Sequence, residues 1–291
     1  MVTAPDRLLR RLEWKLGRRL DGRLQGAYRT VWHGTGLDFT DLRAYSPEDD
    51  VRHIDWNVTA RLDEPHVRQY TEDREMTAWF VVDRSASMRF GGNDGKESVA
   101  GELAISLARL IAQGGNRVGA ILFDNDTKKV IPPRGGRDQT LRIARELTRS
   151  QTSKEQKTTD LGEMLRLAAT TTSRRRSLIF VMSDFIGDPG WERSLAMLTH
   201  RHEVVVIRVV DPAELELPDL GLVLVEDAET GEQILVDTSD PLLRTRLADQ
   251  VGAREEALAE NMRKAGVRPH RVTTDQDLLA VLVDMVRRSG R

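Results

Sequence analysis

The stretch Phe80-Val81-Val82-Asp83-Arg84-Ser85-Ala86-Ser87-Met88 begins as an apolar strand and continues into a segment rich in side-chain oxygens. Side chains at alternate positions of an extended segment point to the same side, so Asp83, Ser85 and Ser87 would present a carboxylate and two hydroxyls to one point. Such donors suit a hard cation, and Mg²⁺ in particular keeps several waters and is seldom fully enclosed by protein. The sequence therefore predicts the start of a divalent-cation site at the end of a strand.

The segments after residue 75 alternate between strand-like apolar runs and stretches with helical periodicity. This alternation predicts an α/β fold with a doubly wound, mostly parallel sheet that is covered by helices on both faces. Ligands of such sheets bind beyond the carboxyl ends of the strands, where Asp83 and the later Asp184 fall. We expect strands at 76–82, 118–123, 177–182, 204–210 and 267–272, helices at 97–112, 139–148, 161–171, 191–198, 241–265 and 278–288, and a hairpin at 223–236.

The pattern Asp-x-Ser-x-Ser-Met at 83–88 resembles the metal-ion-dependent adhesion site of von Willebrand factor A domains, which also needs a Thr and a second Asp from two later loops. Thr159 precedes a helical stretch and matches the Thr loop, while Asp184 ends an apolar run and matches the third loop. The fold that the resemblance implies is Rossmann-type. The implied metal site consists of Asp83, Ser85, Ser87, Thr159 and Asp184.

The resemblance also implies a division of roles. Ser85 and Ser87 would bind the metal directly, Thr159 would join when a partner engages, and Asp83 and Asp184 would act largely through waters. Taken singly, these residues fit a plain structural role as well, in which Asp83 and Ser85 cap the next helix and Asp184 ends a strand in a turn. Their joint order along the chain favours metal binding.

A second resemblance concerns the segments 34–45, 49–56 and 59–61, which are similar to the signature of a bacterial family named domain of unknown function fifty-eight. The similarity extends over nearly the whole chain and includes the polar segment 227–232. It implies a cytoplasmic protein that is often encoded beside a MoxR-type AAA+ ATPase and other A-domain proteins. It further implies a role with them in assembling, activating or chaperoning protein complexes.

We divide the chain into an N-terminal extension at 1–75 and a von Willebrand factor A-like domain at 76–291. Residues 27–75 are polar and turn-rich, so we expect them to pack on the domain rather than fold alone. Alternating charges in the signature predict a paired network with two aromatic residues as apolar cover, and we favour a structural over a catalytic role for it. Its members are Asp41, Arg43, Tyr45, Asp50, Arg52, Asp55, Trp56 and Arg61.

Residues 5–25 have leucines at helical spacing with arginines between them, which predicts a basic amphipathic helix. Such a helix could lie on an anionic membrane surface or in a partner's groove. We favour the simpler alternative, in which its leucines dock on the rest of this protein, because ordinary surface helices show the same stripe.

Composition excludes several function classes. The net charge is −2, with 44 basic against 46 acidic residues and no basic stripe, so nucleic-acid binding is disfavoured. The chain has no Cys, which removes disulfides, thiolate catalysis and cysteine-based metal sites. No apolar run approaches the ~20 residues of a membrane span, and charged residues stand where a secretory signal has its apolar stretch. We therefore expect a cytoplasmic protein.

The segment 91–98 invites comparison with a phosphate-binding loop. Phe90 stands where the first Gly is required, and Glu97 where a Ser or Thr must hold magnesium, so the pattern fails at both positions. We expect this segment to be a turn that leads into the first helix of the A-like domain.

Two main function hypotheses follow, with a membrane-surface scaffold as a weaker third. The first is an interaction module, not an enzyme, that holds Mg²⁺, or alternatively Mn²⁺ or Ca²⁺, and binds an Asp or Glu carboxylate of a partner protein. Neutral hydroxyl ligands leave the cation with excess positive charge that attracts such an anion. The alternative is a magnesium-dependent phosphoryl-transfer or hydrolytic enzyme using Asp83 and Asp184. It lacks a clear nucleophile or base, because Ser85 stands where an acid-base carboxylate would help.

Overall fold

The structure is a computed structural model that describes residues 37–47, 49–72, 76–89, 95–124, 128–149, 160–173, 175–187, 189–215, 219–226 and 233–289. The amphipathic helix expected at 5–25, the predicted metal ligand Thr159 and the polar segment 227–232 lie outside these residues. Within the described ranges, no helix combines the length and the apolar character that crossing a membrane requires.

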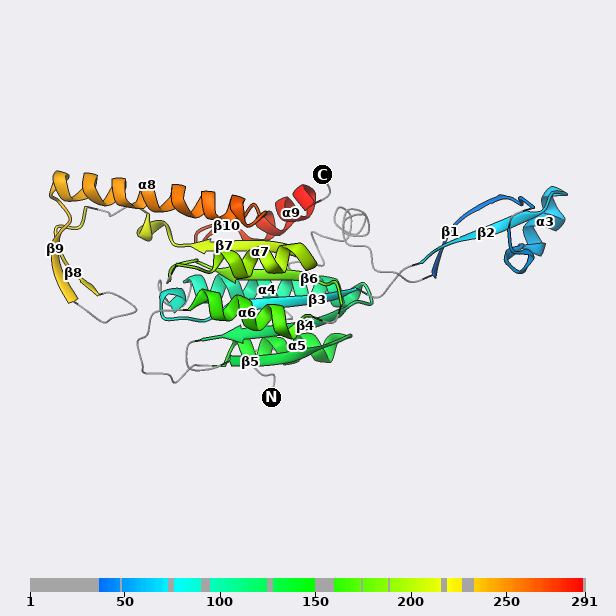
Figure 1. The fold of residues 1–291 in the computed structure, drawn as a ribbon, viewed down its shortest axis with the longest axis horizontal. Helices are drawn as coiled ribbons and strands as arrows, with labels where there is room; N and C mark the ends of the chain where they lie inside the picture. The colour runs from blue at the N-terminus through cyan, green and yellow to red at the C-terminus, as the bar shows by residue number, and fades with distance from the viewer. Residues whose placement is uncertain are drawn as a thin grey trace.

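A six-stranded sheet forms the centre of the fold, with the strand order β10-β7-β6-β3-β4-β5 (Figure 1). All neighbouring strands are parallel except β4 and β5, which are antiparallel. The predicted mostly parallel α/β sheet is therefore confirmed. Its strands are β3 (Thr77–Asp83), β4 (Arg117–Phe123), β5 (Lys128–Arg134), β6 (Leu178–Ser183), β7 (Glu203–Val210) and β10 (His270–Thr273).

Helices cover both faces of this sheet, and alternate side chains of β3 belong to two separate apolar cores. Phe80 and Val82 belong to one apolar core and Trp79 and Val81 to the other, because successive residues of a strand point to opposite faces. The first core includes side chains of α4 (Lys96–Gln113), α5 (Arg137–Leu147) and α9 (Leu278–Ser289). The second includes side chains of α6 (Leu161–Thr171), α7 (Glu192–Arg201) and α8 (Pro241–Lys264).

The central strands are buried on both sides, which explains why they are continuous apolar runs instead of alternating ones. Phe80 of β3 and Phe180 of β6 lie opposite each other in the parallel register, and their rings stack with centroids 5.0 Å apart. This packing fixes β3 and β6 side by side. The loops that follow them therefore open at the same edge of the sheet.

The edge strand β5 was not predicted from the sequence. It contains Pro132 and Pro133 and has mostly exposed or half-buried residues. Proline cannot donate to a strand ladder, so it is confined to edge strands and bulges, and β5 indeed pairs only with β4 in the described sheet.

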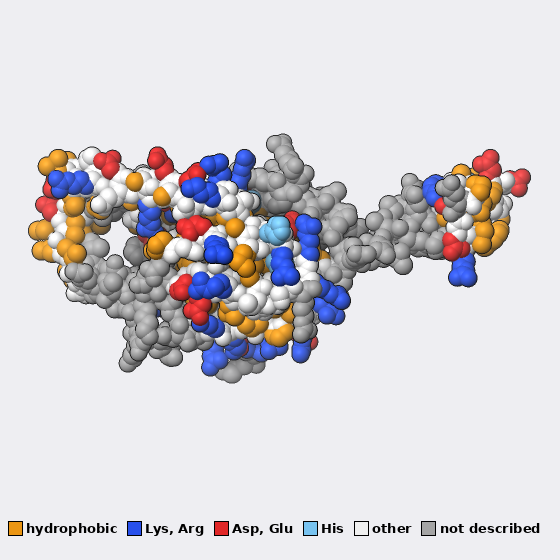
Figure 2. Space-filling view, viewed as in Figure 1, with side chains coloured by type: hydrophobic (Ala, Val, Ile, Leu, Met, Phe, Trp, Pro, Cys, Tyr) orange, Lys and Arg blue, Asp and Glu red, His pale blue; other side chains and the backbone are white. Residues whose placement is uncertain are grey.

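The hairpin predicted at 223–236 is confirmed as β8 (Leu222–Glu226) and β9 (Gln233–Asp237), an antiparallel pair outside the main sheet. Several of its aliphatic side chains are exposed, and Figure 2 shows hydrophobic atoms gathered at this end of the molecule, beside the start of α8. The exposed members include Leu222, Leu224, Ile234 and Leu235.

The signature region forms a small unit of its own. Strand β1 (Leu37–Ala44) pairs with β2 (His66–Glu72), and η1 (Val51–His53) and α3 (Trp56–Leu62) lie between them. In Figure 1 this unit stands away from the six-stranded sheet, so its described residues, 37–47 and 49–72, do not show the packing on the domain that we expected for 27–75.

The contacts of the signature's charged residues differ in part from the predicted network. Asp50 accepts a hydrogen bond from Arg52 N and caps η1, and Asp55 accepts from Asn57 N and Val58 N and caps α3. Short acidic side chains favour such local backbone partners. Arg43 instead forms a bidentate pair with Asp49, at 2.7 and 2.5 Å.

The aromatic cover expected over this network does not form as predicted either. Trp56 is 68% exposed, while Tyr45 is half-buried.

Candidate metal-binding site

The predicted site lies at the carboxyl edge of the sheet. Strand β3 ends at Asp83 and its parallel neighbour β6 ends at Ser183, with Val82 and Met182 directly opposite each other. Asp83 and Asp184 therefore follow adjacent strands at the same edge, as expected for a ligand site in such a sheet.

Asp83 is wholly buried, and both of its carboxylate oxygens accept hydrogen bonds. Ser85 N donates to Oδ1 at 2.9 Å, and Ser183 Oγ donates to Oδ2 at 2.6 Å. Burial, and secondarily the charge of Asp184, raises the pKa of Asp83 to about 7, although the hydrogen bonds from Ser183 and Ser85 act in the opposite direction. The two hydrogen bonds thus offset only part of the cost of burying the negative charge of Asp83.

The hydroxyls of Ser85 and Ser87 are buried beside each other, with their Oγ atoms 3.0 Å apart. The strand does not stay extended to this point, because it ends at Asp83 and Ser87 begins the short 3₁₀ helix η2 (Ser87–Arg89). The two oxygens that the sequence predicted to converge do so, but a turn brings them together instead of strand alternation.

Asp184 is buried, and its carboxylate has two kinds of partner. Oδ1 accepts a hydrogen bond from Ile186 N at 2.9 Å, so the turn role considered for this residue is present. Oδ2 lies 2.6 Å from Lys96 Nζ. One oxygen of Asp184 thus has the turn role, and the other is engaged by a buried ammonium.

The turn after β6 carries an unusual backbone conformation. Phe185 has a φ of 57°, in the left-handed region that non-glycine residues rarely adopt. Its N–H donates to Ser183 Oγ at 2.9 Å, and its ring packs edge-on against Trp191 with centroids 5.1 Å apart. Ser183 thereby joins the carboxylate of Asp83 to the backbone of this strained turn.

Lys96 is a residue of this site that the sequence analysis missed. It is wholly buried at the first position of α4, and its ammonium lies 2.6 Å from Asp184 Oδ2 and 2.5 Å from Glu214 Oε1. It belongs to the segment 91–98 that was set aside as a turn. The available signal was its position, because a cation in the first turn of a helix opposes the helix dipole and needs specific anionic partners.

Two arginines hold the loops around the site. Arg84 pairs with Glu97 of α4 at 2.7 Å and donates to the carbonyl oxygens of Glu146 and Arg149. Arg208 of β7 donates to the carbonyl oxygen of Asp184 at 3.3 Å and forms a bidentate pair with Glu255 of α8. Planar guanidinium groups are suited to such multiple contacts.

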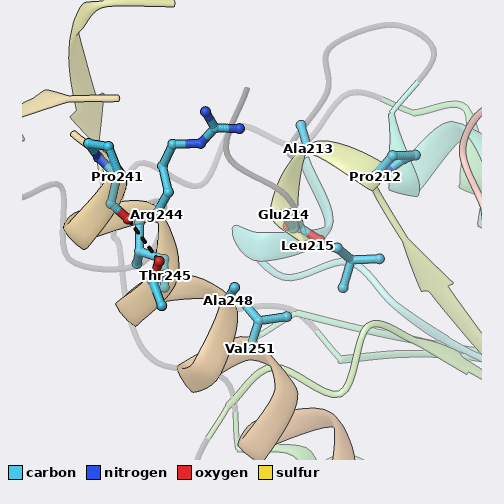
Figure 3. A pocket seen from close by; sticks show the side chains of 10 residues that line it. Pro212, Ala213, Glu214, Leu215, Pro241, Arg244, Thr245, Ala248 and Val251 are labelled. Carbon is cyan, nitrogen blue, oxygen red and sulfur yellow. Dashed lines mark hydrogen bonds between the residues drawn. The ribbon is translucent and has the colours of Figure 1, made fainter. Parts of the chain in front are cut away.

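Glu214 connects the site to a groove on the protein surface. It ends the 3₁₀ helix η4 (Pro212–Glu214), and it lines a groove of about 870 Å³ between η4 and the N-terminal half of α8 (Figure 3). Apolar side chains contribute much of the lining, with Arg244 and Thr245 on the α8 side. The apolar members include Pro212, Leu215, Leu247 and Val251.

The residues present fit a divalent cation. Among the described residues, no three His, Cys, Asp or Glu side chains form a metal-binding cluster, so the candidate donors combine two carboxylates with hydroxyl oxygens. Two adjacent hydroxyl oxygens and two buried carboxylates, close enough that the charge of Asp184 raises the pKa of Asp83, are suitable for a hard cation that is held partly through water.

Comparison with known proteins agrees with the second resemblance. A family model described as protein of unknown function DUF58 matches residues 41–257. The chain belongs to the DUF58 family. This DUF58 protein is 37% identical over 285 residues to an uncharacterized protein of Mycobacterium tuberculosis, which covers 97% of this chain and 89% of the relative.

Solved structures similar to the DUF58 protein include an aerotolerance-related membrane protein from Bacteroides fragilis. The identity is 17%, the TM-score is 0.49, and the match covers 74% of this chain and 98% of the other. A von Willebrand factor type A protein from Catenulispora acidiphila matches with 11% identity and a TM-score of 0.35, over 76% of this chain and 43% of the other. The strand order and registers of the DUF58 protein itself define its fold.

Proposed function

We propose that this protein is an interaction module that binds a carboxylate of a partner protein through a divalent cation held at Asp83, Ser85, Ser87, Thr159 and Asp184. The observation that supports the proposal is the convergence of the two serine hydroxyls, 3.0 Å apart, at the edge where the buried Asp83 ends β3 and the buried Asp184 directly follows β6. Mg²⁺ is the expected ion, with Mn²⁺ or Ca²⁺ as alternatives, because all of the donors are oxygens.

The protein's own residues prepare such a site before any ion arrives. The hydrogen bonds from Ser85 N and Ser183 Oγ orient the carboxylate of Asp83, and the short loop fixes the two serine hydroxyls beside it. When bound, the cation would supply a positive charge with an open coordination position. Because hydroxyl ligands are neutral, they leave more of that charge available to an external anion than carboxylate ligands would.

For the partner, we propose a protein that presents an Asp or Glu side chain. The family resemblance favours a MoxR-type AAA+ ATPase or another A-domain protein, acting with this chain in the assembly or activation of protein complexes. We further propose that the chain acts by binding and not by catalysis, because the hydrogen bonds to Asp83 and Asp184 restrain both carboxylates and the sequence offers no clear nucleophile. A broad panel of phosphate esters should show no turnover, and turnover abolished by Asp184→Ala would contradict this part.

Calorimetric titration of the full chain with Mg²⁺ and Mn²⁺ tests the metal site. We expect one site in the wild type, no binding in Asp83→Ala, and at least about tenfold weaker binding in Ser85→Ala, which removes a direct oxygen donor. Ser106→Ala is the matched control, because Ser106 is a buried serine further along α4. Equal affinity in all of these proteins would contradict the proposed ligand set.

Capture of the MoxR-type ATPase from the same organism tests the partner. Binding should require Mg²⁺ or Mn²⁺, disappear with a chelator, and fall in Asp83→Ala in parallel with metal affinity. Capture that is unchanged by chelator would count against a carboxylate-to-metal contact.

A further inference from the structure

Lys96 lies where a second cation would directly affect the proposed metal site. Its side chain is wholly buried, and the ammonium contacts the Asp184 and Glu214 carboxylates at 2.6 and 2.5 Å. A buried charge is tolerated only with good partners, and the first turn of a helix adds a further unfavourable field for a cation. These two carboxylates therefore hold Lys96 in place, and Lys96 in turn neutralises part of their charge.

Asp184 is shared between this lysine and the proposed metal. A carboxylate has about four lone-pair positions, so the contacts with Lys96 and Ile186 leave room for a metal-bound water. The electrostatic interaction is nevertheless unfavourable, because the ammonium that contacts Asp184 repels a divalent ion that binds nearby. In the absence of metal, Lys96 thus neutralises part of the negative charge of Asp184 that a divalent cation would otherwise neutralise.

Glu214 competes with Asp184 for the same ammonium. It comes from η4, a segment that follows β7 and lies far from Lys96 in sequence, and its side chain is 20% exposed while that of Lys96 is fully buried. Its presence in the groove lining means that a surface feature is joined to the metal site through one side chain (Figure 3).

We infer that Lys96 is a built-in counter-cation that weakens divalent-ion binding at this site, and that Glu214 limits this effect by sharing the ammonium with Asp184. The inference rests on the proposed function, since it concerns the affinity of the same metal site. Lys96 and Glu214 are positioning residues here and are not metal ligands. Because Glu214 also lines the groove between η4 and α8, a molecule in this groove that displaced Glu214 would change the affinity for the metal.

Two substitutions should shift metal affinity in opposite directions. Lys96→Met removes the charge and keeps an unbranched side chain that is one heavy atom shorter, so Mn²⁺ should bind roughly tenfold or more tightly than to the wild type. Glu214→Gln removes one of the two carboxylates that share the ammonium and so strengthens its pull on Asp184, and Mn²⁺ should bind several-fold more weakly. A purely structural role predicts loss of affinity in both variants, because damage to the fold cannot improve binding.

The double variant, Lys96→Met with Glu214→Gln, distinguishes two ways in which Glu214 can affect the metal: through its contact with Lys96, or through its own charge. If Glu214 acts through Lys96, Glu214→Gln should have little effect on Mn²⁺ affinity in the Lys96→Met background. An equal effect in both backgrounds would show that Glu214 acts directly and would overturn the sharing of the ammonium. Lys264→Met, which removes an exposed, ion-paired lysine at the end of α8, should leave the affinity unchanged.

The titration is made on full chains whose circular dichroism confirms folding, and Lys96→Gln replaces Lys96→Met if the latter does not fold. Wild type that binds Mn²⁺ while the folded Lys96 variant binds no more tightly would overturn this inference and leave the proposed function standing. No Mn²⁺ binding by the wild type or any variant would overturn the proposed function itself. Binding by the Lys96 variant alone would support the counter-cation role and would contradict the metal-dependent function of the natural chain.

Discussion

The buried carboxyl group of Asp83 should make the stability of the metal-free protein fall as the pH rises. Its pKa increases from 3.8 to about 7 on folding, so between these values the folded state retains a proton that the unfolded state has lost. The unfolded state is then favoured progressively with increasing pH. The stabilisation is fully present below pH 4 and is lost by the time the pH has passed 7.

The size of the effect follows from the difference between the two pKa values, about 3. At 1.36 kcal/mol for each unit of pKa, the ionisation of Asp83 should remove about 4 kcal/mol from the free energy of unfolding by pH 8. Somewhat more than a third of this is already lost at pH 5. Asp83→Asn removes the titration, and its amide can retain hydrogen bonds to Ser85 and Ser183.

The assay is denaturant unfolding of the wild type and Asp83→Asn between pH 5 and pH 8, followed by tryptophan fluorescence. Trp79 and Trp191 are buried in the second apolar core and report on the domain that contains the site. In the absence of metal, the free energy of unfolding of Asp83→Asn relative to that of the wild type should rise by about 2 to 3 kcal/mol between pH 5 and pH 8. Saturating Mg²⁺ should close the gap at pH 8 by stabilising the wild type alone.

Parallel pH profiles for the two proteins would refute this reasoning. They would mean that Asp83 has an ordinary pKa in the folded chain, and that the site does not hold an uncompensated carboxyl group.

Two further predictions concern the fold. Phe180→Ala removes the ring that stacks on Phe80, and it should cost about 3 to 5 kcal/mol of unfolding free energy in urea because it opens a cavity between β3 and β6; a loss below 1 kcal/mol would contradict the described core. Asp55→Ala removes the N-cap of α3 and should cost the unit about 1 kcal/mol, seen as faster hydrogen exchange at Asn57 and Val58, and unchanged exchange would argue against the cap.

The sequence predicted those parts of the fold whose physical cause is local. Strands β3 and β6 are buried on both faces, so their apolar runs stand out, and their terminal aspartates fall at the predicted edge. Strand β5 was missed because an edge strand with two prolines lacks both the apolar run and the alternating pattern. The acids of the signature were paired with arginines in the prediction, but Asp50 and Asp55 cap the helices that follow them.

The sequence predicted the candidate ligands that are close together in the chain or follow strands that pair with each other. Ser85 and Ser87 converge with Asp83 because one short loop contains all three, and the parallel pairing of β3 with β6 adds Asp184. The position of Lys96 in the first turn of a helix was a signal, but its partners Asp184 and Glu214 could not be assigned from sequence, because they lie on two other loops and the contact with Glu214 spans 118 residues. Ser183 was missed for a similar reason, since its bond to Asp83 spans 100 residues.

Anomalous diffraction from crystals of the full chain soaked in Mn²⁺ is the most direct test of the central claim. We predict a peak about 2 to 2.3 Å from the Oγ atoms of both Ser85 and Ser87, on the side of Asp83 and Asp184, with at least one coordination position held by water or by a carboxylate of another molecule. A well-occupied Mn²⁺ peak elsewhere, or no peak beside the two serines at saturating Mn²⁺, would contradict the account.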